Sequence, residues 1–373
     1  ARSGTFDENN SLLKLGRVRI SLSPNPFENS TSFKQELHLN DGYITISGAK
    51  NKHTTQVKLW VDIFHPVVHV EMNSSLPVVA TATYESWRHQ DRLLKGKENN
   101  QNSYKWAPQG EVKTVADEIA FQQNAVQFYH QNKPFTVFDV TVKQQGMEAV
   151  KAQLFNPLKN LVFGGRMFGK NFVSAGNTQG KYVDTEYKGW SLKSKSAAKN
   201  HKLNVVLHTQ YTPSADDWKS GVQQAAVQAG ESQKQTAKKT QQWWNEYWKR
   251  SFIYIKTGSP TSDSTAWQVG RNYQLMRYML GCNISGTYPT KFNGGLFTYD
   301  PSFTDSTQKF TPDFRNWGGG THTAQNQRLV YWPMLKSGDF DLMKPQFEFY
   351  RGILKNAELR SEFYWNHKGA SFT

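Results

Sequence analysis

The chain has 373 residues, of which 37% are hydrophobic and 14% aromatic, enough for a sizeable core and for two or three domains. Its sequence contains no run of 18 apolar residues, which excludes a membrane-spanning helix. The single cysteine, Cys282, excludes an internal disulfide and a site built from several cysteines, and we expect a buried structural thiol there. We expect neither a cofactor nor a metal ion.

The formal net charge of +15 is compatible with an anionic partner such as nucleic acid or an anionic polysaccharide. The lysines are scattered, however, and the sequence has no block of five or six basic residues, so we expect no nucleic-acid binding. A basic protein that binds anionic polysaccharide stays open as an alternative. Because the sequence starts at Ala1 rather than Met, we expect a processed or trimmed product, and the lack of a leader is no argument against export.

Residues 1–212 are expected to form a first domain, a large antiparallel β-sandwich. Apolar and polar residues alternate with period 2 between turns rich in Asn, Gly and Pro, which indicates strands with one buried face. Many strands without intervening helices favour a sandwich. The alternating segments are 17–22, 33–39, 43–47, 56–64, 136–142 and 202–208.

Four local motifs in this domain have structural interpretations. Residues 40–42, Asn-Asp-Gly, predict a hairpin turn, and the polar segment 95–112 predicts a long loop. The stretch Gly164–Asn171 is one residue short of a phosphate-binding loop, because Asn171 stands where Ser or Thr would hold magnesium; we interpret it as a glycine-rich hairpin. His65 and His69 lie four apart, but no third ligand is evident, which argues against a metal site.

The pattern becomes helical near Ser214, and residues 213–257 are expected to form a linker. Ser214 and Asp217 can form a capping box, which predicts a helix that breaks near Gly230. A second helix, about 232–249, ends in four large aromatic residues and should therefore lie between two packed bodies. We expect one short strand at 252–256. The four aromatic residues are Trp243, Trp244, Tyr247 and Trp248.

Residues 258–373 are expected to form a third, helical domain. Helices are predicted from about 262 to 281, from about 323 to 336, and from Asp339 or Asp341 to about Tyr364. Between the first two lies an irregular stretch, 287–320, and a loop of this length is uncommon unless it is functional.

The segment 315–333 is the centre of the functional prediction. Gly318–Gly320 allow the backbone to approach a ligand closely, polar side chains follow at once, and an apolar helix comes next. A flexible loop followed by a helix that is polar at first and then apolar is typical of a pocket rim that joins a core. An ordinary loop in front of a buried helix is the alternative.

The sequence resembles a family of glycoside hydrolases over about residues 230–335. Trp243-Trp-x-x-Tyr-Trp-x-Arg-Ser is similar to the linker that joins a β-super-sandwich to an (α/α)6 barrel in such enzymes. Tyr273–Leu280 and Pro289–Gly295 resemble the first barrel helix and the glycine loop of the α-L-fucosidase family 95. His322-Thr-x-x-Asn326, followed by Tyr331-Trp332-Pro333, resembles the central motif of that family. A bacterial relative fits best.

The resemblance implies a β-super-sandwich, a helical linker and the first part of an (α/α)6 barrel. It implies an inverting glycoside hydrolase that cleaves an α-linked sugar, such as L-fucose or L-galactose, from oligo- or polysaccharide in the periplasm or outside a bacterial cell. Too few helices follow residue 257 for a full barrel, so we expect the remaining part of the same polypeptide or a second chain to complete it. The general acid and base of the family would then lie outside these residues.

The resemblance assigns activation of the attacking water to Asn326, our candidate catalytic residue. The family pattern has two asparagines two residues apart, and the first falls on Ala324, so water activation or the substrate differs here. A catalytically inactive, carbohydrate-binding relative is therefore an alternative. We expect Trp317, His322 and Asn326 to line one pocket. The predicted substrate-binding residues are Trp317, His322, Gln327, Trp332, Asn293 and Asp313.

Inverting glycoside hydrolysis needs two carboxyl groups, one as acid and one as base. Asp313 is the best local candidate because it leads into Trp317 and the glycines, although a turn or cap role is open. Glu358 and Glu362 are four apart on one helix face and are expected to be solvated surface. The remaining candidates are Asp300 and Asp305.

Overall fold

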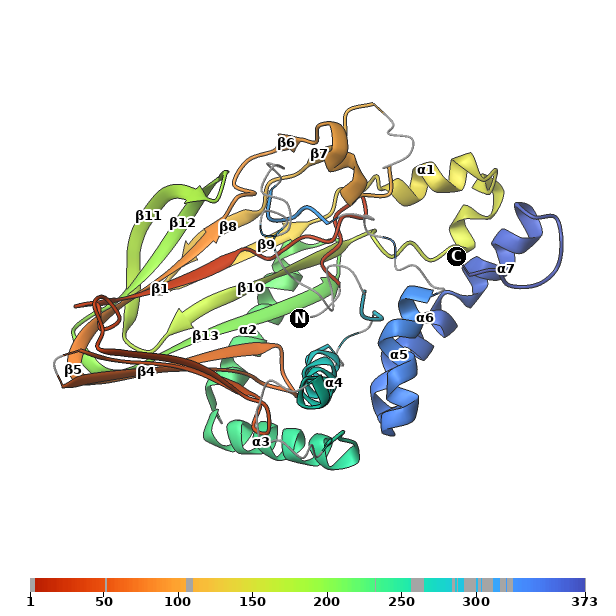
Figure 1. The fold of residues 1–373 in the computed structure, drawn as a ribbon. Coiled ribbons are helices and arrows are strands. Elements are labelled where there is room, and N and C mark those ends of the chain that lie inside the picture. Colours follow the sequence, from red (N-terminus) through yellow and green to blue (C-terminus); the bar gives the residue numbers. More distant parts are fainter. Residues whose placement is uncertain are drawn as a thin grey trace.

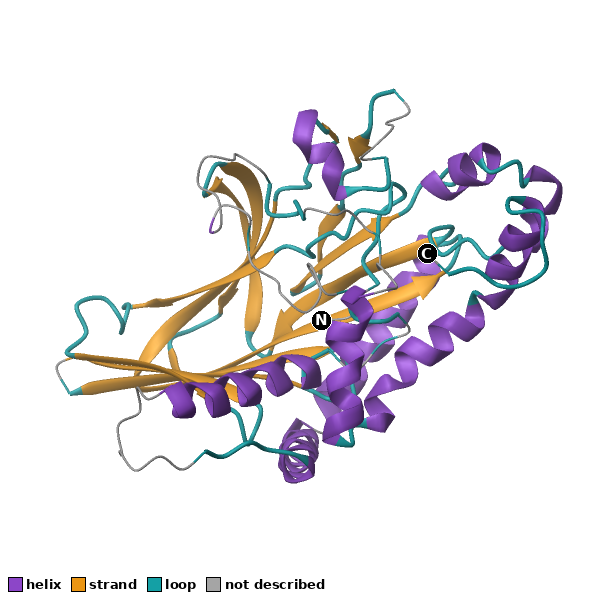
Figure 2. Cartoon of the chain, turned by 45° about the vertical axis from the view of Figure 1, so that its right-hand side comes forward, coloured by secondary structure: helices purple, strands orange, loops and turns teal. Residues whose placement is uncertain are grey.

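The computed structural model describes residues 4–50, 52–104, 110–231, 233–255, 265–283, 286, 288–291, 300, 303, 311–315, 320 and 325–372. A large antiparallel β region is followed by helices, which lie along one side and one end of the strands (Figures 1 and 2). The predicted fold class is therefore confirmed at this level.

The strands form two layers. The larger layer has the order β2 (Ser32–His38), β3 (Tyr43–Lys50), β4 (His53–Val61), β5 (Val67–Ser86), β13 (Ala198–Tyr211), β10 (Leu161–Gly169), β9 (Ala125–Gln131) and β8 (Glu118–Gln122). The smaller layer contains β1 (Arg17–Ser23), β12 (Thr185–Ser194) and β11 (Phe172–Tyr182). A separate pair is formed by β6 (Arg92–Leu93) and β7 (Lys113–Thr114).

The long strand β5 joins the two layers. Its first half pairs with β4 and β13, whereas its second half, from Val79 to Ser86, pairs with β1 and β12. The main core lies between the layers, and the alternating residues of each strand supply it, as the period-2 pattern predicts. Its buried side chains include Leu22, Val57, Met72, Tyr84, Phe128, Met167, Trp190, Leu192 and Leu203.

One predicted strand is wrong, because residues 136–142 belong to helix α1 (Val137–Gln144). Thr136 and Asp139 form a capping box in which the Thr136 backbone nitrogen donates to Asp139 Oδ2 over 2.8 Å. Val137 and Val142 are buried in two different clusters, which a helix turn allows. Short apolar runs fit either periodicity, and here the cap decides in favour of the helix.

The other local motifs behave as structural elements. Residues 39–42 connect β2 to β3, with Gly42 at a φ of +69°, so the predicted hairpin turn is confirmed. Segment 95–104 is a loop that includes the short helix η1 (Gly96–Gln101), and residues 105–109 lie outside the described part.

The glycines of the segment that resembles a phosphate-binding loop serve strand packing. A Cβ atom on Gly164 would lie 2.1 Å from the Phe128 carbonyl oxygen, and one on Gly165 would lie 2.4 Å from that of Val206. The chain turns at Lys170 and Asn171 into β11, not into a helix. The predicted hairpin is wrong, because the strands on either side of this turn do not pair with each other. Strand β10 pairs with β9 and β13, while β11 pairs with β12.

Helices begin where the pattern changes. Helix α2 (Ala215–Glu231) packs Trp218 and Val222 on the larger sheet, and Ser214 Oγ accepts from the Asp216 and Asp217 backbone nitrogens. Asp217 does not complete the predicted capping box, because its carboxylate accepts from Thr212 Oγ1 over 2.9 Å. Helix α3 (Gln233–Arg250) follows, with residue 232 outside the described part.

The aromatic end of α3 lies between the β region and the later helices. Trp248 Nε1 donates to the Leu39 carbonyl oxygen in the β2–β3 turn. Trp244 and Tyr247 form a buried cluster with helix α4 (Thr265–Gly281), helix α5 (Gln325–Ser337) and η4 (Phe340–Met343). The expectation that this segment is packed on two sides is confirmed.

The last helices are α6 (Lys344–Gly352) and α7 (Leu354–Phe363). Helix α7 returns to the β region, where Leu359 packs against α1 and η2 (Glu148–Gln153), and Asn356 exchanges two hydrogen bonds with the Phe155 backbone. In the described part of the chain, no helix is both long enough and apolar enough to cross a membrane.

Two expectations near the linker are wrong. Residues 252–255 form no strand, and their side chains are exposed, with Tyr254 at 82%. Cys282 is exposed rather than buried, although the groups packed around its sulfur raise the pKa of the thiol and so keep it protonated. A protonated thiol is a poor nucleophile, as expected for a structural cysteine.

Candidate functional site at helices α5 and α6

Helix α5 is held in place through its buried face. Tyr331 Oη accepts from the Thr290 backbone nitrogen over 2.9 Å, and Gln327 Nε2 donates to the Thr290 carbonyl oxygen over 3.4 Å. The next residue, Lys291, is 1% exposed and donates from Nζ to the Gly320 carbonyl oxygen over 2.8 Å. These contacts tie the end of the glycine run to the start of α5 through a segment that follows α4.

The flank of α5 next to this buried face lines an open pocket of about 520 Å³. Trp332 is 59% exposed there, and the Arg328 guanidinium lies 5.2 Å from the centre of its ring. Aromatic faces and polar side chains thus meet in one concave site, a combination that suits a sugar. The lining residues are Gln327, Arg328, Trp332, Leu335, Met343, Gln346, Phe347, Tyr350 and Phe372.

Two of the predicted site residues, Gln327 and Trp332, therefore share this pocket. Asn326 is half-buried on the first turn of α5, about 120° around the helix axis from Trp332, on a different flank. Trp317, His322 and Asn293 lie outside the described residues, so their predicted approach to Asn326 stays a prediction. Gln346, Phe347 and Tyr350 were missed, since helix α6 shows only an ordinary amphipathic pattern.

The carboxylate of Asp313 accepts hydrogen bonds from other parts of the protein. Its Oδ1 accepts from the Lys14 backbone nitrogen over 2.9 Å and from Arg88 Nη1 over 2.7 Å. Its Oδ2 accepts from Trp87 Nε1 over 2.7 Å. With a side chain only 3% exposed, Asp313 anchors the segment 311–315 to the β region, a structural role other than the turn or cap left open above.

The anchor continues into the sandwich as a chain of buried charges. Arg88 also pairs with Asp117 over 2.8 Å, and His130 bridges Asp117 and Glu8 over 3.0 and 3.5 Å. Burial opposes protonation of His130, but its hydrogen bonds to Asp117 and Glu8 outweigh this and raise its pKa to about 9. Burial works against ionisation of Asp117 too, yet Arg88 and His130 hold its pKa below the ordinary value.

The remaining carboxyl candidates are not directed at the pocket. Asp300 is buried and accepts from Lys14 Nζ and Tyr182 Oη. Glu358 and Glu362 are exposed on α7, as predicted for solvated surface. Asp305 lies outside the described residues. Among the described residues, those that line the pocket include no carboxylate, so they can bind and orient a ligand but supply no acid–base pair.

Fold and site define a β-sandwich protein that continues into a helical region with an aromatic, polar pocket. The chain belongs to the family described as "Domain of unknown function (DUF5703)", whose model matches residues 1–253. No curated protein matches the sequence.

Among solved structures, the chain is similar to one titled "Putative kojibiose phosphorylase from human microbiome", with 13% sequence identity and a TM-score of 0.47. The alignment covers 97% of this chain but 42% of that one. The chain thus spans less than half the length of that protein.

Proposed function

We propose that this chain is part of a carbohydrate-active enzyme, a glycoside hydrolase, whose sugar lies in the pocket between α5 and α6. The observation that carries the proposal is the meeting of the exposed Trp332 ring with Arg328 and Gln346 in one concave site. An aromatic face can stack on a sugar ring, while amide and guanidinium groups bind its hydroxyls with directional hydrogen bonds.

In this proposal Asn326 orients the attacking water at the edge of the site, as the motif resemblance implies. The reaction is inverting, and the substrate is an α-linked sugar such as L-fucose or L-galactose at the end of an oligo- or polysaccharide. Such a reaction requires one carboxylic acid and one carboxylate. Since the described pocket residues provide neither, we propose that both come from parts of the protein outside the described residues.

A catalytically inactive, sugar-binding relative is the second candidate. Two observations favour it: Ala324 stands where the family pattern has an asparagine, and carboxylates are missing from the described pocket lining. Both candidates predict sugar binding through Trp332, but only the enzyme predicts turnover.

The helices around the pocket expose many large apolar side chains, which suggests a further packing partner. Trp332, Phe340 and Phe347 are 59%, 64% and 60% exposed, and Leu329 and Leu335 are 51% and 50% exposed. Large apolar side chains exposed in such number on these helices are unfavourable in water. We propose that the remaining part of the same polypeptide or a second chain covers it, as in an (α/α)6 barrel, and that the protein acts in the periplasm or outside a bacterial cell.

The test is a hydrolysis assay of the full-length protein on a panel of aryl and natural α-glycosides, with the wild type, Trp332→Ala and Trp267→Ala. Trp267 is a matched control, because it is a helical tryptophan 44% exposed, with the Arg271 guanidinium 5.0 Å from its ring centre. We expect Trp332→Ala to raise KM and Trp267→Ala to leave it unchanged. Equal effects of the two substitutions would contradict the pocket assignment, and binding without turnover would favour the inactive relative.

A further inference from the structure

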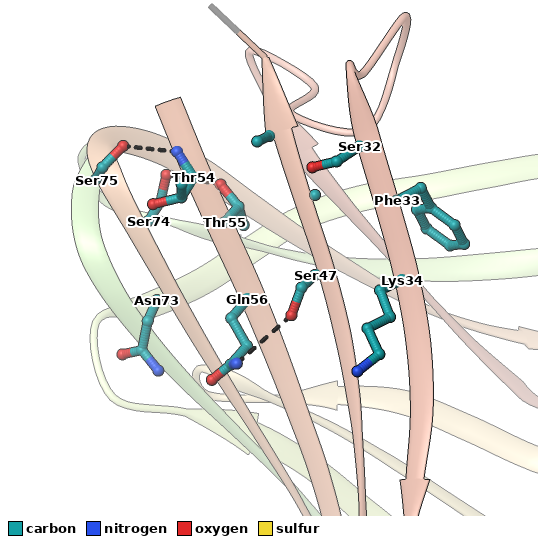
Figure 3. A pocket seen from close by; sticks show the side chains of 12 residues that line it. Ser32, Phe33, Lys34, Ser47, Thr54, Thr55, Gln56, Asn73, Ser74 and Ser75 are labelled. Atoms are coloured by element: carbon teal, nitrogen blue, oxygen red, sulfur yellow. Dashed lines mark hydrogen bonds between the residues drawn. The ribbon is translucent and has the colours of Figure 1, made fainter. Parts of the chain in front are cut away.

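A polar strip runs along the outer face of the sandwich, remote from the α5 pocket. Side chains alternate between the two faces of a strand, so residues in register with Ser47 on neighbouring strands share its face. Lys34 on β2, Gln56 on β4 and Asn73 on β5 lie in this row. Figure 3 shows them side by side with Ser47, and Gln56 Nε2 is 3.5 Å from Ser47 Oγ.

This row forms part of a shallow hollow of about 470 Å³. Most of its lining side chains carry a hydroxyl or an amide group, and Phe33 points away from the Ser47 row (Figure 3). Hydroxyl and amide side chains can each donate and accept, so the hollow is suited to a ligand with many hydroxyl groups. The further lining side chains are Ser32, Thr54, Thr55, Ser74 and Ser75.

The same face continues into a basic cleft where α3 covers the sheet. This cleft of about 250 Å³ lies between Tyr43, Lys58 and Trp60 on the strands and Lys234 and Lys238 on α3. In register, Tyr43 pairs with Trp60, and Ser47 pairs with Gln56 four residues further along each strand. The hollow and the cleft are therefore consecutive on one face, and from Tyr43 to Ala49 the strip is roughly 20 Å long.

The cleft has an excess of positive charge. Within the described part of the chain, none of the Lys58, Lys234 and Lys238 ammonium groups lies in an ion pair, and Lys58 Nζ lies 4.1 Å from the centre of the Tyr43 ring. Of the carboxylates on this face, Glu36 is paired with Lys34 over 2.7 Å, whereas Asp41 and Glu71 accept only from neutral donors, so three ammonium groups face two carboxylates. Asp41 accepts from Gln241 Nε2 over 2.7 Å, and Glu71 accepts from Trp60 Nε1 over 3.2 Å and Gln233 Nε2 over 3.4 Å.

We propose that this strip is a binding site for an anionic oligosaccharide, whose carboxylate or sulfate group lies in the lysine cleft and whose hydroxyl groups extend along the Ser47 row. Three ammonium groups without acidic partners complement a negative charge, and the neutral row complements the rest of a sugar chain. A nucleic acid fits less well, because its charge is spread evenly along the chain. The strip carries Lys58, Lys234 and Lys238 at one end, and its described lining residues include no arginine.

The site is separate from the α5 pocket, so the two proposals can fail independently. Titration calorimetry of the full chain would measure Kd for a sulfated oligosaccharide, an oligogalacturonate, a neutral oligosaccharide of equal length and a single-stranded DNA of equal charge. The first variant combines Lys58→Ala, Lys234→Ala and Lys238→Ala. The control combines Lys143→Ala, Lys159→Ala and Lys355→Ala, which removes the same charge from other exposed positions.

We expect at least one anionic oligosaccharide to bind, with a Kd that rises with salt and rises about 10- to 100-fold in the cleft variant. The control variant should change Kd less than about threefold. Ser47→Ala combined with Gln56→Ala should weaken binding while leaving its salt dependence unchanged, since these groups are neutral. Trp332→Ala should have no effect on this ligand.

Three results would overturn the proposal: no binding of either anionic oligosaccharide, equal weakening by the control variant, or equally tight binding of the neutral oligosaccharide. Single-stranded DNA that bound more tightly through the same three lysines would identify the strip as a nucleic-acid site instead. The circular dichroism spectrum of each variant establishes that a lost interaction does not reflect unfolding.

Discussion

Arg88 and Asp313 form a buried ion pair across 225 residues of sequence, with Arg88 Nη1 lying 2.7 and 2.8 Å from the two carboxylate oxygens. Their side chains are 4% and 3% exposed. Arg88 follows the last residues of β5, so this contact ties the segment 311–315, which precedes the glycine run in the sequence, to the sandwich. Asp117 on the other side of Arg88 balances its charge.

Removing one partner should therefore destabilise the fold strongly. Asp313→Ala leaves three buried donors, Arg88 Nη1, Trp87 Nε1 and the Lys14 backbone N–H, without their acceptor, and we expect a loss of about 3–5 kcal/mol in the free energy of unfolding. Glu246→Ala is the control, because its exposed pair with Lys249 should contribute less than about 1 kcal/mol. Urea unfolding measures both, and a loss below about 1 kcal/mol for Asp313→Ala would show that the anchor is dispensable.

The buried histidine predicts a loss of stability at alkaline pH. The folded-state pKa of His130 is about 9, above its ordinary value of 6.5, so its contribution is fully present below pH 6.5 and disappears as pH rises to about 9. Burial and Arg315 lower the pKa of Lys14 to about 8. Because Lys14 loses its proton at lower pH in the folded state than in the unfolded state, it makes stability rise with pH, but only above pH 8.

We expect the free energy of unfolding to fall by about 1–3 kcal/mol as the pH rises from 6.5 to a value between 8 and 9. The substitution His130→Gln should flatten this part of the pH profile. Urea unfolding across this pH range measures the effect. A wild-type profile that is flat or rises with pH would show that His130 is neutral in the folded protein.

Gly42 is expected to be irreplaceable in the β2–β3 turn. Its φ of +69° disfavours a side chain, and a Cβ atom there would lie 1.9 Å from Nε1 of the buried Trp244. Gly42→Ala should cost about 2–4 kcal/mol. Gly230→Ala, one residue before the end of α2, meets nothing within 4 Å and should stabilise by less than about 1 kcal/mol. Thermal unfolding compares the two, and similar shifts of Tm would refute this packing.

Asn326→Ala tests the catalytic assignment. If Asn326 orients water, turnover should fall about 10²–10³-fold, whereas Tm should hardly change because a half-buried amide on the first turn of a helix contributes little to packing. Asn272→Ala, an exposed asparagine on α4, is the control. Should the Asn326 variant unfold yet keep full activity per folded molecule, Asn326 would be a capping residue.

Most of the fold could be predicted from periodicity, because burial imposes period 2 on strands and a helical period on α2 to α7. The strand predicted at 136–142 failed because a short apolar segment fits a strand or a helix, and the Thr136–Asp139 capping box favours the helix. The strand predicted at 252–256 failed for a different reason: β-prone side chains form a strand only beside a partner strand, and in the described part of the chain no strand pairs with Phe252–Ile255.

The site was less predictable, since it depends on contacts across long sequence distances. Gln327 and Trp332 were chosen from the motif and do share a pocket, but Phe347 and Tyr350 join it only through the packing of α6. The carboxylate of Asp313 looked available because its partners, Trp87 and Arg88, are over two hundred residues away. No local pattern reveals such a pairing.

The most direct test of the sugar-binding pocket is a calorimetric titration with the α-glycoside that the panel selects, on the wild type, Trp332→Ala and Trp267→Ala. Losing a stacking face should raise Kd about tenfold or more for Trp332→Ala, equivalent to about 1.4 kcal/mol, and leave it unchanged for Trp267→Ala. If Trp332→Ala binds the sugar as tightly as the wild type, the pocket between α5 and α6 is not where the sugar binds.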